Sequence, residues 1–459
     1  MLDKLLGKNV FVLGLGKSGM SSLIELKKRG VHVIAWDDNK DLRMKAGNFG
    51  AQLTPPEEFD FTTAALLLLS PAISRKHYAY QAATAAGIPI ITDVELFVSS
   101  HKGEKFIGIT GTNGKSTTTA LVYHILKENN VPAVIGGNFG IAVFDMPKLP
   151  KGGWYVLELS SYQLELVPSL DLDIAAWLNL TTDHIDRHGS MEAYFDAKFN
   201  IMKRAHKKKY TNVIALDDEY TRRVFKMVEK DPHATNIPVS FDRKVPGPWV
   251  NVRGVLMDDG KELLDTTRLE NLKGKHNRQN IAVAFAIARA AGIPDAGIAK
   301  AITSFKNLSH RMENIGEVAG IRFINDSKAT NAESTRWALG SYDEIYWILG
   351  GKPKDDGIEP LTEIFTDERI KRAFTIGAAG KDFHKVIKRD IDSYRCGKLD
   401  KAVAKAFKLA LKDLKKGRVV NPVILLSPSA ASFDQYESFE ARGEHFRRLF
   451  EELKAKHES

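Results

Sequence analysis

The sequence is nearly free of cysteine, since Cys396 is the only one among 459 residues. No disulfide can form within the chain, and a zinc site made of cysteines is excluded. Apolar runs such as Ala64–Leu69 are far shorter than the roughly 20 residues that a membrane-spanning helix needs. Residues 1–16 also lack the apolar stretch and cleavage site of a signal peptide. We therefore expect a cytoplasmic protein without a membrane span.

Charge of one sign is only moderately in excess, because 66 Lys and Arg face 57 Asp and Glu, a formal net charge of +9. The lysine runs are short, as at 207–209 and 415–416, and acidic residues are mixed with basic ones elsewhere, as on solvated helix faces. We expect no nucleic-acid partner. The same positive field would favour a small anionic substrate.

Strand-like apolar runs alternate with amphipathic helical segments along the whole chain, without repeats or low-complexity tracts. This alternation predicts an α/β fold with parallel sheets. Polar stretches at 99–104 and 304–309 predict three domains, residues 1–100, 101–306 and 307–459. We expect Rossmann-like first and last domains around a central P-loop-type domain. The predicted strands are Val10–Gly14, Val31–Trp36, Phe106–Thr110, Tyr155–Glu158, Ile174–Leu180, Ile321–Asn325 and Ile345–Leu349; the predicted helices include Ser190–Ala205 and Ile281–Ile302.

The segment Phe106–Thr117 reads as a strand, a glycine-rich turn and a helix start. Small residues let backbone N–H groups surround phosphate oxygens at a helix N-terminus. Lys115 can reach the β- and γ-phosphates, and the Ser116 or Thr117 hydroxyl can hold Mg²⁺. The loop is not a strict Walker A motif, since Ile109 stands where the first glycine would be.

The segment Thr110–Thr117 resembles the variant phosphate loop of Mur ligases and folylpolyglutamate synthetases, which implies an ATP-dependent amide-forming ligase. The resemblance continues through Gly136–Asn138, Glu158–Leu164, Asp183–Arg187, Gly274–Asn277, His310–Glu313 and Asn325–Asn331. The ATP-binding residues that it implies are Gly111, Thr112, Asn113, Gly114, Lys115, Ser116, Thr117, Asn277, Asn280, Arg311, Asp326 and Lys328.

Glu158 and His184 follow predicted strands, where open α/β sheets meet ligands. Each also has an ordinary explanation, a solvated carboxylate and a hydrogen-bonded imidazole. The resemblance implies that both bind magnesium, two ions in all, together with Ser116 and Lys198. Without the resemblance, Lys198 would be interpreted as a surface lysine; in Mur ligases the matching lysine carries a carbamate. The implied catalytic residues are Lys115, His184 and Lys198.

The run Gly14–Gly19 after a strand, with Asp37 ending the next, is a dinucleotide fingerprint. It is compatible with NAD or with another phosphate ligand. The resemblance implies that this domain binds the UDP group of the substrate through Lys17, Ser18, Asp37, Ser70 and Asn138. Ala72 replaces a usual glycine, and Asp38–Asn39 replace a frequent Thr-Arg pair, so the uridine contacts differ from the family pattern.

The C-terminal segments Leu426–Gln435 and Phe439–Gly443 resemble the site of the family branch that adds D-glutamate to UDP-N-acetylmuramoyl-L-alanine. This branch supplies a peptidoglycan precursor. The implied D-glutamate residues are Thr330, Lys354, Ser432 and Phe439, and Lys354 could otherwise be an ordinary loop lysine. The Asp-Asn-Pro-Arg signature of relatives that add diaminopimelate or lysine is absent.

Three rival interpretations remain open from the sequence. A relative that adds L-alanine to UDP-N-acetylmuramate would differ in the amino acid on which ATP hydrolysis depends. An NAD-dependent oxidoreductase would leave the second phosphate loop without a purpose. A non-catalytic nucleotide-binding module would not need Glu158, His184 and Lys198 together. We expect a monomer.

Overall fold

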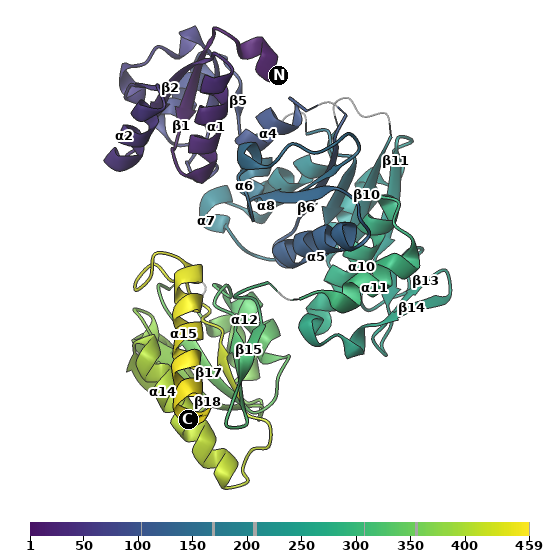
Figure 1. Cartoon of the computed structure of the whole chain (residues 1–459), viewed down its shortest axis with the longest axis vertical. Coiled ribbons are helices and arrows are strands. Elements are labelled where there is room, and N and C mark those ends of the chain that lie inside the picture. The colour runs from purple at the N-terminus through teal and green to yellow at the C-terminus, as the bar shows by residue number, and fades with distance from the viewer. Residues whose placement is uncertain (102, 168–169, 205–208, 307, 354–356, 459) are drawn as a thin grey trace. The chain divides into compact units, whose positions relative to one another are not determined.

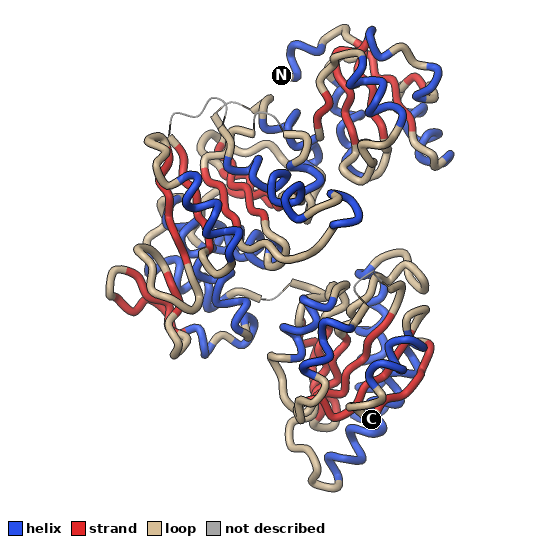
Figure 2. The backbone as a smooth tube through the Cα atoms, turned by 180° about the vertical axis from the view of Figure 1, so that it is seen from behind, coloured by secondary structure: helices blue, strands red, loops and turns tan. Residues whose placement is uncertain are grey.

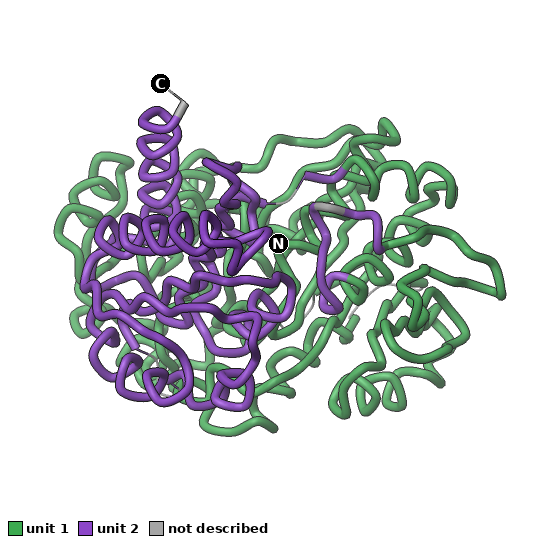
Figure 3. Tube along the Cα trace, turned by 90° about the horizontal axis from the view of Figure 1, so that it is seen from below, with its two compact units in different colours: residues 1–266, 278–304 green, residues 267–277, 305–459 purple. Residues whose placement is uncertain are grey.

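The computed structural model describes residues 1–101, 103–167, 170–204, 209–306, 308–353 and 357–458. The chain divides into two compact units (Figure 3). Unit 1 comprises residues 1–266 and 278–304, and unit 2 comprises residues 267–277 and 305–459. Unit 1 carries two parallel sheets and unit 2 carries one mixed sheet, so the predicted α/β fold is confirmed. The expected boundaries of three domains stay a prediction.

The first sheet of unit 1 is parallel and buried on both faces (Figure 1). In β1, Val10 and Val12 face one apolar core while Phe11 and Leu13 face the other, as expected for a parallel strand covered by helices on both sides. Across the sheet the order is β3 (Gln52–Leu53), β2 (His32–Trp36), β1 (Asn9–Leu13), β4 (Ala64–Leu69) and β5 (Ile90–Ile91). The helices are α1 (Lys17–Lys28), α2 (Lys40–Asn48), α3 (Tyr78–Ala85) and α4 (Asp93–Val98).

The second sheet of unit 1 is also parallel, and its strand order places the loops after β6, β8 and β9 side by side. Such an edge, where the strand order reverses, is where open α/β sheets bind ligands. Its order is β11 (Ala234–Val239), β10 (Tyr210–Ala215), β9 (Ile174–Trp177), β6 (Lys105–Thr110), β8 (Trp154–Glu158) and β7 (Ala133–Gly137). A small antiparallel sheet follows: β12 (Trp249–Val250), β13 (Val255–Asp258) and β14 (Lys261–Asp265).

Two predicted helices of this region differ from the structure. The segment predicted as Ser190–Ala205 forms α8 (Met191–Phe199) and a short 3-10 turn, Asn200–Met202. The segment predicted as Ile281–Ile302 is two helices, α10 (Lys275–Ala290) and α11 (Asp295–Ser304). Gly292, at φ +95°, and Pro294 separate them, because a left-handed glycine ends a helix and the residue before proline disfavours helical backbone. The other helices are α5 (Lys115–Glu128), α6 (Ser161–Leu164), α7 (Ile185–His188) and α9 (Glu219–Val228).

Unit 2 is built on a sheet with helices on both faces (Figure 2). Trp347 and Leu349 of β17 face one core, and Tyr346 and Ile348 face the other. The strands in order are β15 (Glu313–Val318), β16 (Ile321–Asn325), β20 (Val423–Leu426), β17 (Ile345–Gly350), β18 (Ile370–Ile376) and β19 (Ser393–Gly397). Only β15 runs antiparallel to its neighbour. The helices are α12 (Ala332–Leu339), α13 (Gly380–Ile387), α14 (Leu399–Lys415) and α15 (Phe439–Glu458).

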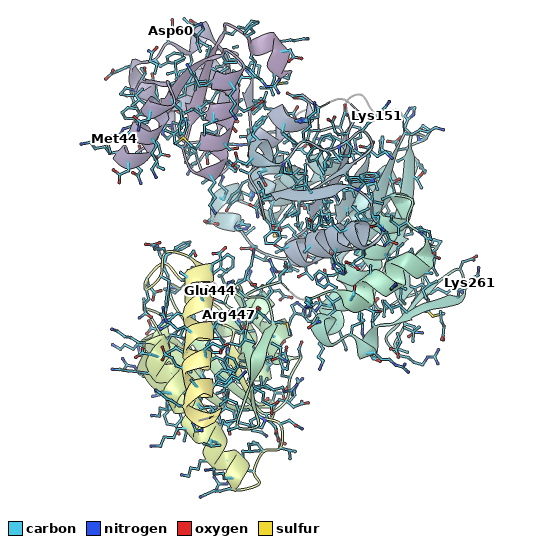
Figure 4. All side chains as sticks on the ribbon, viewed as in Figure 1. Met44, Asp60, Lys151, Lys261, Glu444 and Arg447 are labelled. Atoms are coloured by element: carbon cyan, nitrogen blue, oxygen red, sulfur yellow. The ribbon has the colours of Figure 1, made fainter. Side chains whose placement is uncertain are left out.

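Helix α15 packs on β15, the antiparallel edge strand. The Arg447 guanidinium donates a 2.5 Å hydrogen bond to Glu313 Oε1, and Figure 4 shows Arg447 and Glu444 on this helix. Among the residues described, no helix is long and apolar enough to span a membrane.

Candidate active site

The phosphate loop joins β6 to α5 as the sequence predicts. Gly114 precedes α5 with φ +84°, and a Cβ there would lie 2.3 Å from Asn280 Oδ1, so only glycine fits. The Lys115 ammonium bends back over the loop and donates 2.8 Å hydrogen bonds to the carbonyls of Gly111 and Thr112. Ser116 and Thr117 are buried in the first turn of α5. The loop thus presents a helix N-terminus and one cation to the same space.

Asn179 shapes this loop, although it was not among the predicted site residues. Its Oδ1 accepts from Asn113 N–H at 2.8 Å, and its Nδ2 donates to the Asn113 carbonyl at 3.2 Å. Thr112 N–H also donates to the Asn179 carbonyl at 3.0 Å. The sequence prediction treated Asn179 as part of a strand that in fact ends at Trp177. A polar amide inside an apolar run was the signal that could have revealed it.

Asn277 and Asn280 lie inside the first turns of α10, not before a helix as predicted. Asn280 Oδ1 accepts from Thr118 Oγ1 at 3.2 Å, which places it against the helix of the phosphate loop. Asn277 Nδ2 donates to the Lys273 carbonyl at 2.7 Å. Asn280 therefore meets the predicted ATP site, while the described bond of Asn277 is to the preceding segment.

Glu158 ends β8 and is only 2% exposed. Its carboxylate accepts hydrogen bonds from Ser116 Oγ and, at 2.8 Å, from Asn138 Nδ2. Two predicted magnesium residues are thus in direct contact. Asn138, predicted to bind the UDP group, lies here beside the carboxylate. A carboxylate and a hydroxyl are the oxygen donors that Mg²⁺ prefers, so the pair fits this ion.

Lys198 is a core residue, 1% exposed, and not a surface lysine. Its ammonium group contacts the Gly111 carbonyl at 3.0 Å and Thr110 Oγ1 at 3.4 Å, both neutral oxygens. Burial, reinforced by the charge of Lys115, lowers the pKa of Lys198 well below its ordinary value, against the opposing effect of Asp183 and Glu158. Burial thus makes the neutral amine, the form that reacts with CO₂, easier to form than in an exposed lysine.

His184 adopts the left-handed backbone, φ +57°, just before α7. Tyr162 OH and His184 Nδ1 are 2.9 Å apart, and Asp183 Oδ2 lies 3.6 Å from His184 Nε2. Burial raises the pKa of Tyr162 to about 12, so the phenol stays protonated. Within the described residues, no three His, Cys, Asp or Glu side chains gather as a metal site.

The predicted UDP-binding residues of the first sheet gather at its carboxyl edge. Asp37 Oδ2 accepts from Leu15 N–H at 2.7 Å. A Cβ on Gly14 would lie 2.5 Å from Ser70 Cβ, so the loops after β1 and β4 touch. Lys17 is exposed at the start of α1, and Ser18 follows it in the same helix.

In unit 2, two predicted residues, Lys328 and Phe439, lie together at the start of α15. The Lys328 ammonium stands 4.8 Å from the Phe439 ring, and Lys328 N–H donates to the His310 carbonyl at 3.1 Å. Asp326 accepts from Ser427 Oγ at 2.9 Å, and burial raises its pKa to about 7. Three other predicted residues also belong to this unit. Arg311 precedes Met312, Thr330 N–H donates to the Lys328 carbonyl, and Ser432 is 2% exposed. Lys354 lies outside the described residues.

Arg442 of α15 is almost completely buried and was not predicted as a site residue. Its guanidinium donates to Ser327 Oγ at 3.0 Å, the Ser327 carbonyl at 2.8 Å and the Ala430 carbonyl at 3.1 Å. Burial lowers its pKa to about 10. Arg442 thereby joins the loop that carries Lys328 to the loop that carries Ser432.

Comparison with known proteins identifies the family of this arrangement. Residues 109–288 match the Mur ligase middle domain. The chain is 42% identical over 451 residues to the UDP-N-acetylmuramoylalanine--D-glutamate ligase of Paramagnetospirillum magneticum, covering 96% of each protein. The chain belongs to the Mur ligase family. A ligase of the same name from Rhodospirillum rubrum is 41% identical to this Mur ligase over 460 residues, covering 97% of this chain and 95% of the relative.

Solved structures share the fold of this Mur ligase. The UDP-N-acetylmuramate-alanine ligase of Thermotoga maritima has a TM-score of 0.59 at 17% identity, covering 97% of this chain and 100% of that one. MurF from Acinetobacter baumannii also has a TM-score of 0.59, at 14% identity, with 99% and 92% covered. Both likenesses extend over nearly the whole of this Mur ligase.

Proposed function

We propose that this Mur ligase joins the amine of D-glutamate to the alanyl carboxylate of UDP-N-acetylmuramoyl-L-alanine, with ATP as the energy source. The observation that carries the proposal is 42% identity to a ligase of that name over 96% of both chains. The enzyme would act in peptidoglycan precursor synthesis, in the cytoplasm, as a monomer.

The first step is phosphorylation of the alanyl carboxylate, which makes a poor electrophile reactive. Phosphoryl transfer depends mainly on positioning and on neutralising charge. Lys115 and the N–H groups of Gly111–Ser116 would cradle the transferred phosphoryl group. Glu158 and Ser116, with His184, would hold Mg²⁺, which neutralises phosphate charge when bound. Asn277, Asn280, Arg311, Asp326 and Lys328 remain predicted ATP ligands.

The second step is attack of the D-glutamate amine on the acyl phosphate. Phosphate then leaves from a tetrahedral intermediate, and the new bond is an amide. Thr330, Lys354, Ser432 and Phe439 are proposed to bind D-glutamate, and Arg442 supports them by holding two of their loops.

Lys198 is proposed to carry a carbamate. The neutral amine adds to CO₂ and loses one proton, giving an N-carboxylate with two oxygens. The buried position of Lys198 among the carbonyl of Gly111 and the hydroxyl of Thr110, together with its lowered pKa, supports this reaction. A carbamate would add an oxygen ligand and a negative charge where an ammonium would repel Mg²⁺.

The direct test is phosphate release from ATP and UDP-N-acetylmuramoyl-L-alanine with a panel of amino acids. We expect release to require D-glutamate and the nucleotide substrate together, and L-glutamate to substitute poorly. Turnover with L-alanine and UDP-N-acetylmuramate would instead assign the enzyme to the L-alanine-adding branch. Absence of any ATP-dependent release would contradict a ligase.

A further inference from the structure

A buried carboxylate that the proposed mechanism does not use lies at the end of α6. Glu165 has an 8% exposed side chain. Its oxygens lie 3.4 Å from Arg187, 3.4 Å from His188 Nδ1 and 3.5 Å from Arg75 Nε. Burial alone would raise the pKa of Glu165, but the His188 hydrogen bond and the charges of these partners lower it overall. Glu165 is therefore ionised and paired, the state in which a buried carboxylate is tolerated.

Glu165 and its partners Arg75, Arg187 and His188 form a cluster, here called the Glu165 cluster. On one side, this cluster contacts the loop that follows β4. Arg187 donates to the Pro71 carbonyl at 3.4 Å, and Arg75 donates to the Glu165 carbonyl at 3.5 Å. Pro71 follows Ser70, a predicted UDP-binding residue. The cluster therefore fixes the backbone next to the proposed nucleotide site of the first sheet.

On the other side, the cluster reaches His184 and the phosphate loop. The Arg187 guanidinium lies 5.0 Å from the Tyr162 ring, whose hydroxyl is 2.9 Å from His184 Nδ1. His188 packs on Tyr194 at 5.1 Å between ring centroids, and Tyr194 OH lies 3.2 Å from Thr112 Oγ1. Arg187 and His188 both belong to α7, which directly follows His184.

We infer that Glu165 is a positioning residue. It joins the Ser70–Arg75 loop to α7 and so fixes the position of His184 relative to the bound nucleotide substrate. The inference rests on the proposed function, because it treats Ser70 and His184 as parts of one site. A carboxylate that merely joined two sheets would affect stability alone. Substitution of a residue that orients a metal ligand without binding the metal itself instead lowers activity by about 10- to 100-fold.

The test compares Glu165→Gln, which keeps the shape and removes the charge, with the full-length wild-type enzyme. We expect the KM for UDP-N-acetylmuramoyl-L-alanine to rise and kcat to fall, so that kcat/KM drops by about 10- to 100-fold. The KM for D-glutamate should stay near wild type, and circular dichroism should show a folded protein at the assay temperature. Glu165→Asp should restore part of the loss. Should Glu165→Gln fold poorly, Arg75→Met serves as the second variant, because Arg75 is 51% exposed and its removal spares the core.

Asp145→Asn is the matched control. Asp145 Oδ1 accepts from Ser21 Oγ at 2.7 Å, a contact that also joins the first sheet region to the central one, at a distance from α7 in the sequence. We expect this variant to keep wild-type kinetics. If the wild-type enzyme is active and both Glu165→Gln and Arg75→Met keep wild-type kinetics, the inference about Glu165 is overturned while the proposed function stands. A parent enzyme that does not use these substrates would overturn the proposed function and this inference with it.

Discussion

Replacing Lys198 with methionine separates the chemistry of its amine from its packing. The side chain is 1% exposed, so methionine keeps most of the buried volume. Because methionine cannot donate to the Gly111 carbonyl, the swap costs about 1–3 kcal/mol of stability. Loss of one preorganised electrostatic group at a reacting centre typically lowers turnover by about 10²- to 10³-fold. We therefore expect a folded Lys198→Met protein with turnover reduced by about 10²-fold or more.

The same substitution should change the pH dependence of stability. Burial, with the charge of Lys115, lowers the pKa of Lys198 in the folded protein well below 10.5. At pH values between the lowered pKa of Lys198 in the folded protein and 10.5, its pKa in the unfolded chain, the unfolded chain binds a proton that the folded protein does not. The free energy of unfolding therefore rises with pH across that window and levels off above about 10.5. Urea denaturation of Lys198→Met should lack this rise.

The assay is the initial rate of phosphate release by wild type, Lys198→Met and Lys198→Ala, with and without bicarbonate or acetate. Depletion of bicarbonate should slow the wild type only. Acetate should restore part of the activity of Lys198→Ala, which has space for a carboxylate, but not of Lys198→Met, in which that space is filled. A fully active Lys198→Met enzyme would refute the carbamate and leave Lys198 as a packing residue.

Three further substitutions probe other parts of the site. Lys115→Ala should lower turnover by about 10²-fold or more because a charge-stabilising donor is lost, while circular dichroism stays unchanged; unaltered turnover would mean that ATP is handled elsewhere. Burial makes the Asp326 carboxyl ionise at a higher pH in the folded protein than in the unfolded chain, so the wild-type free energy of unfolding should fall as the pH rises from 3.8 to about 7. Asp326→Asn should lack this fall. Denaturation at several pH values measures the difference, and a profile like that of the wild type would contradict the prediction. Arg442→Met should cost about 1–3 kcal/mol, since buried carbonyls lose their donor; thermal unfolding would show no shift if these bonds were unimportant.

Much of the fold was predictable because short segments of the sequence determine their own secondary structure. The apolar run before Gly111 and the Gly-Lys-Ser-Thr sequence after it define a strand, a loop and a helix start without reference to the rest of the chain. The split of one predicted helix into α10 and α11 was equally readable, since Gly292 and Pro294 both stand at the break. The error came from giving the apolar periodicity more weight than these two residues.

The contacts within the site were less predictable, because they join residues far apart in the chain. Nothing near Lys198 in the sequence reveals its burial, which depends on packing against Thr110 and Gly111. The bond between Tyr162 and His184 likewise forms only once α6 lies beside α7. Asn179 was hidden for a different reason, since an amide next to a strand end can serve the strand or the loop. Sequence patterns name such residues more easily than they name their partners.

The most direct test of the proposed reaction is one mass spectrum. UDP-N-acetylmuramoyl-L-alanine, labelled with ¹⁸O in its alanyl carboxylate, is incubated with ATP, Mg²⁺ and D-glutamate. If the carboxylate is phosphorylated and the D-glutamate amine then displaces phosphate, the nucleotide product gains one glutamyl residue and the released phosphate carries one ¹⁸O. Unlabelled phosphate, or a nucleotide substrate that gains no glutamyl residue, would contradict the account.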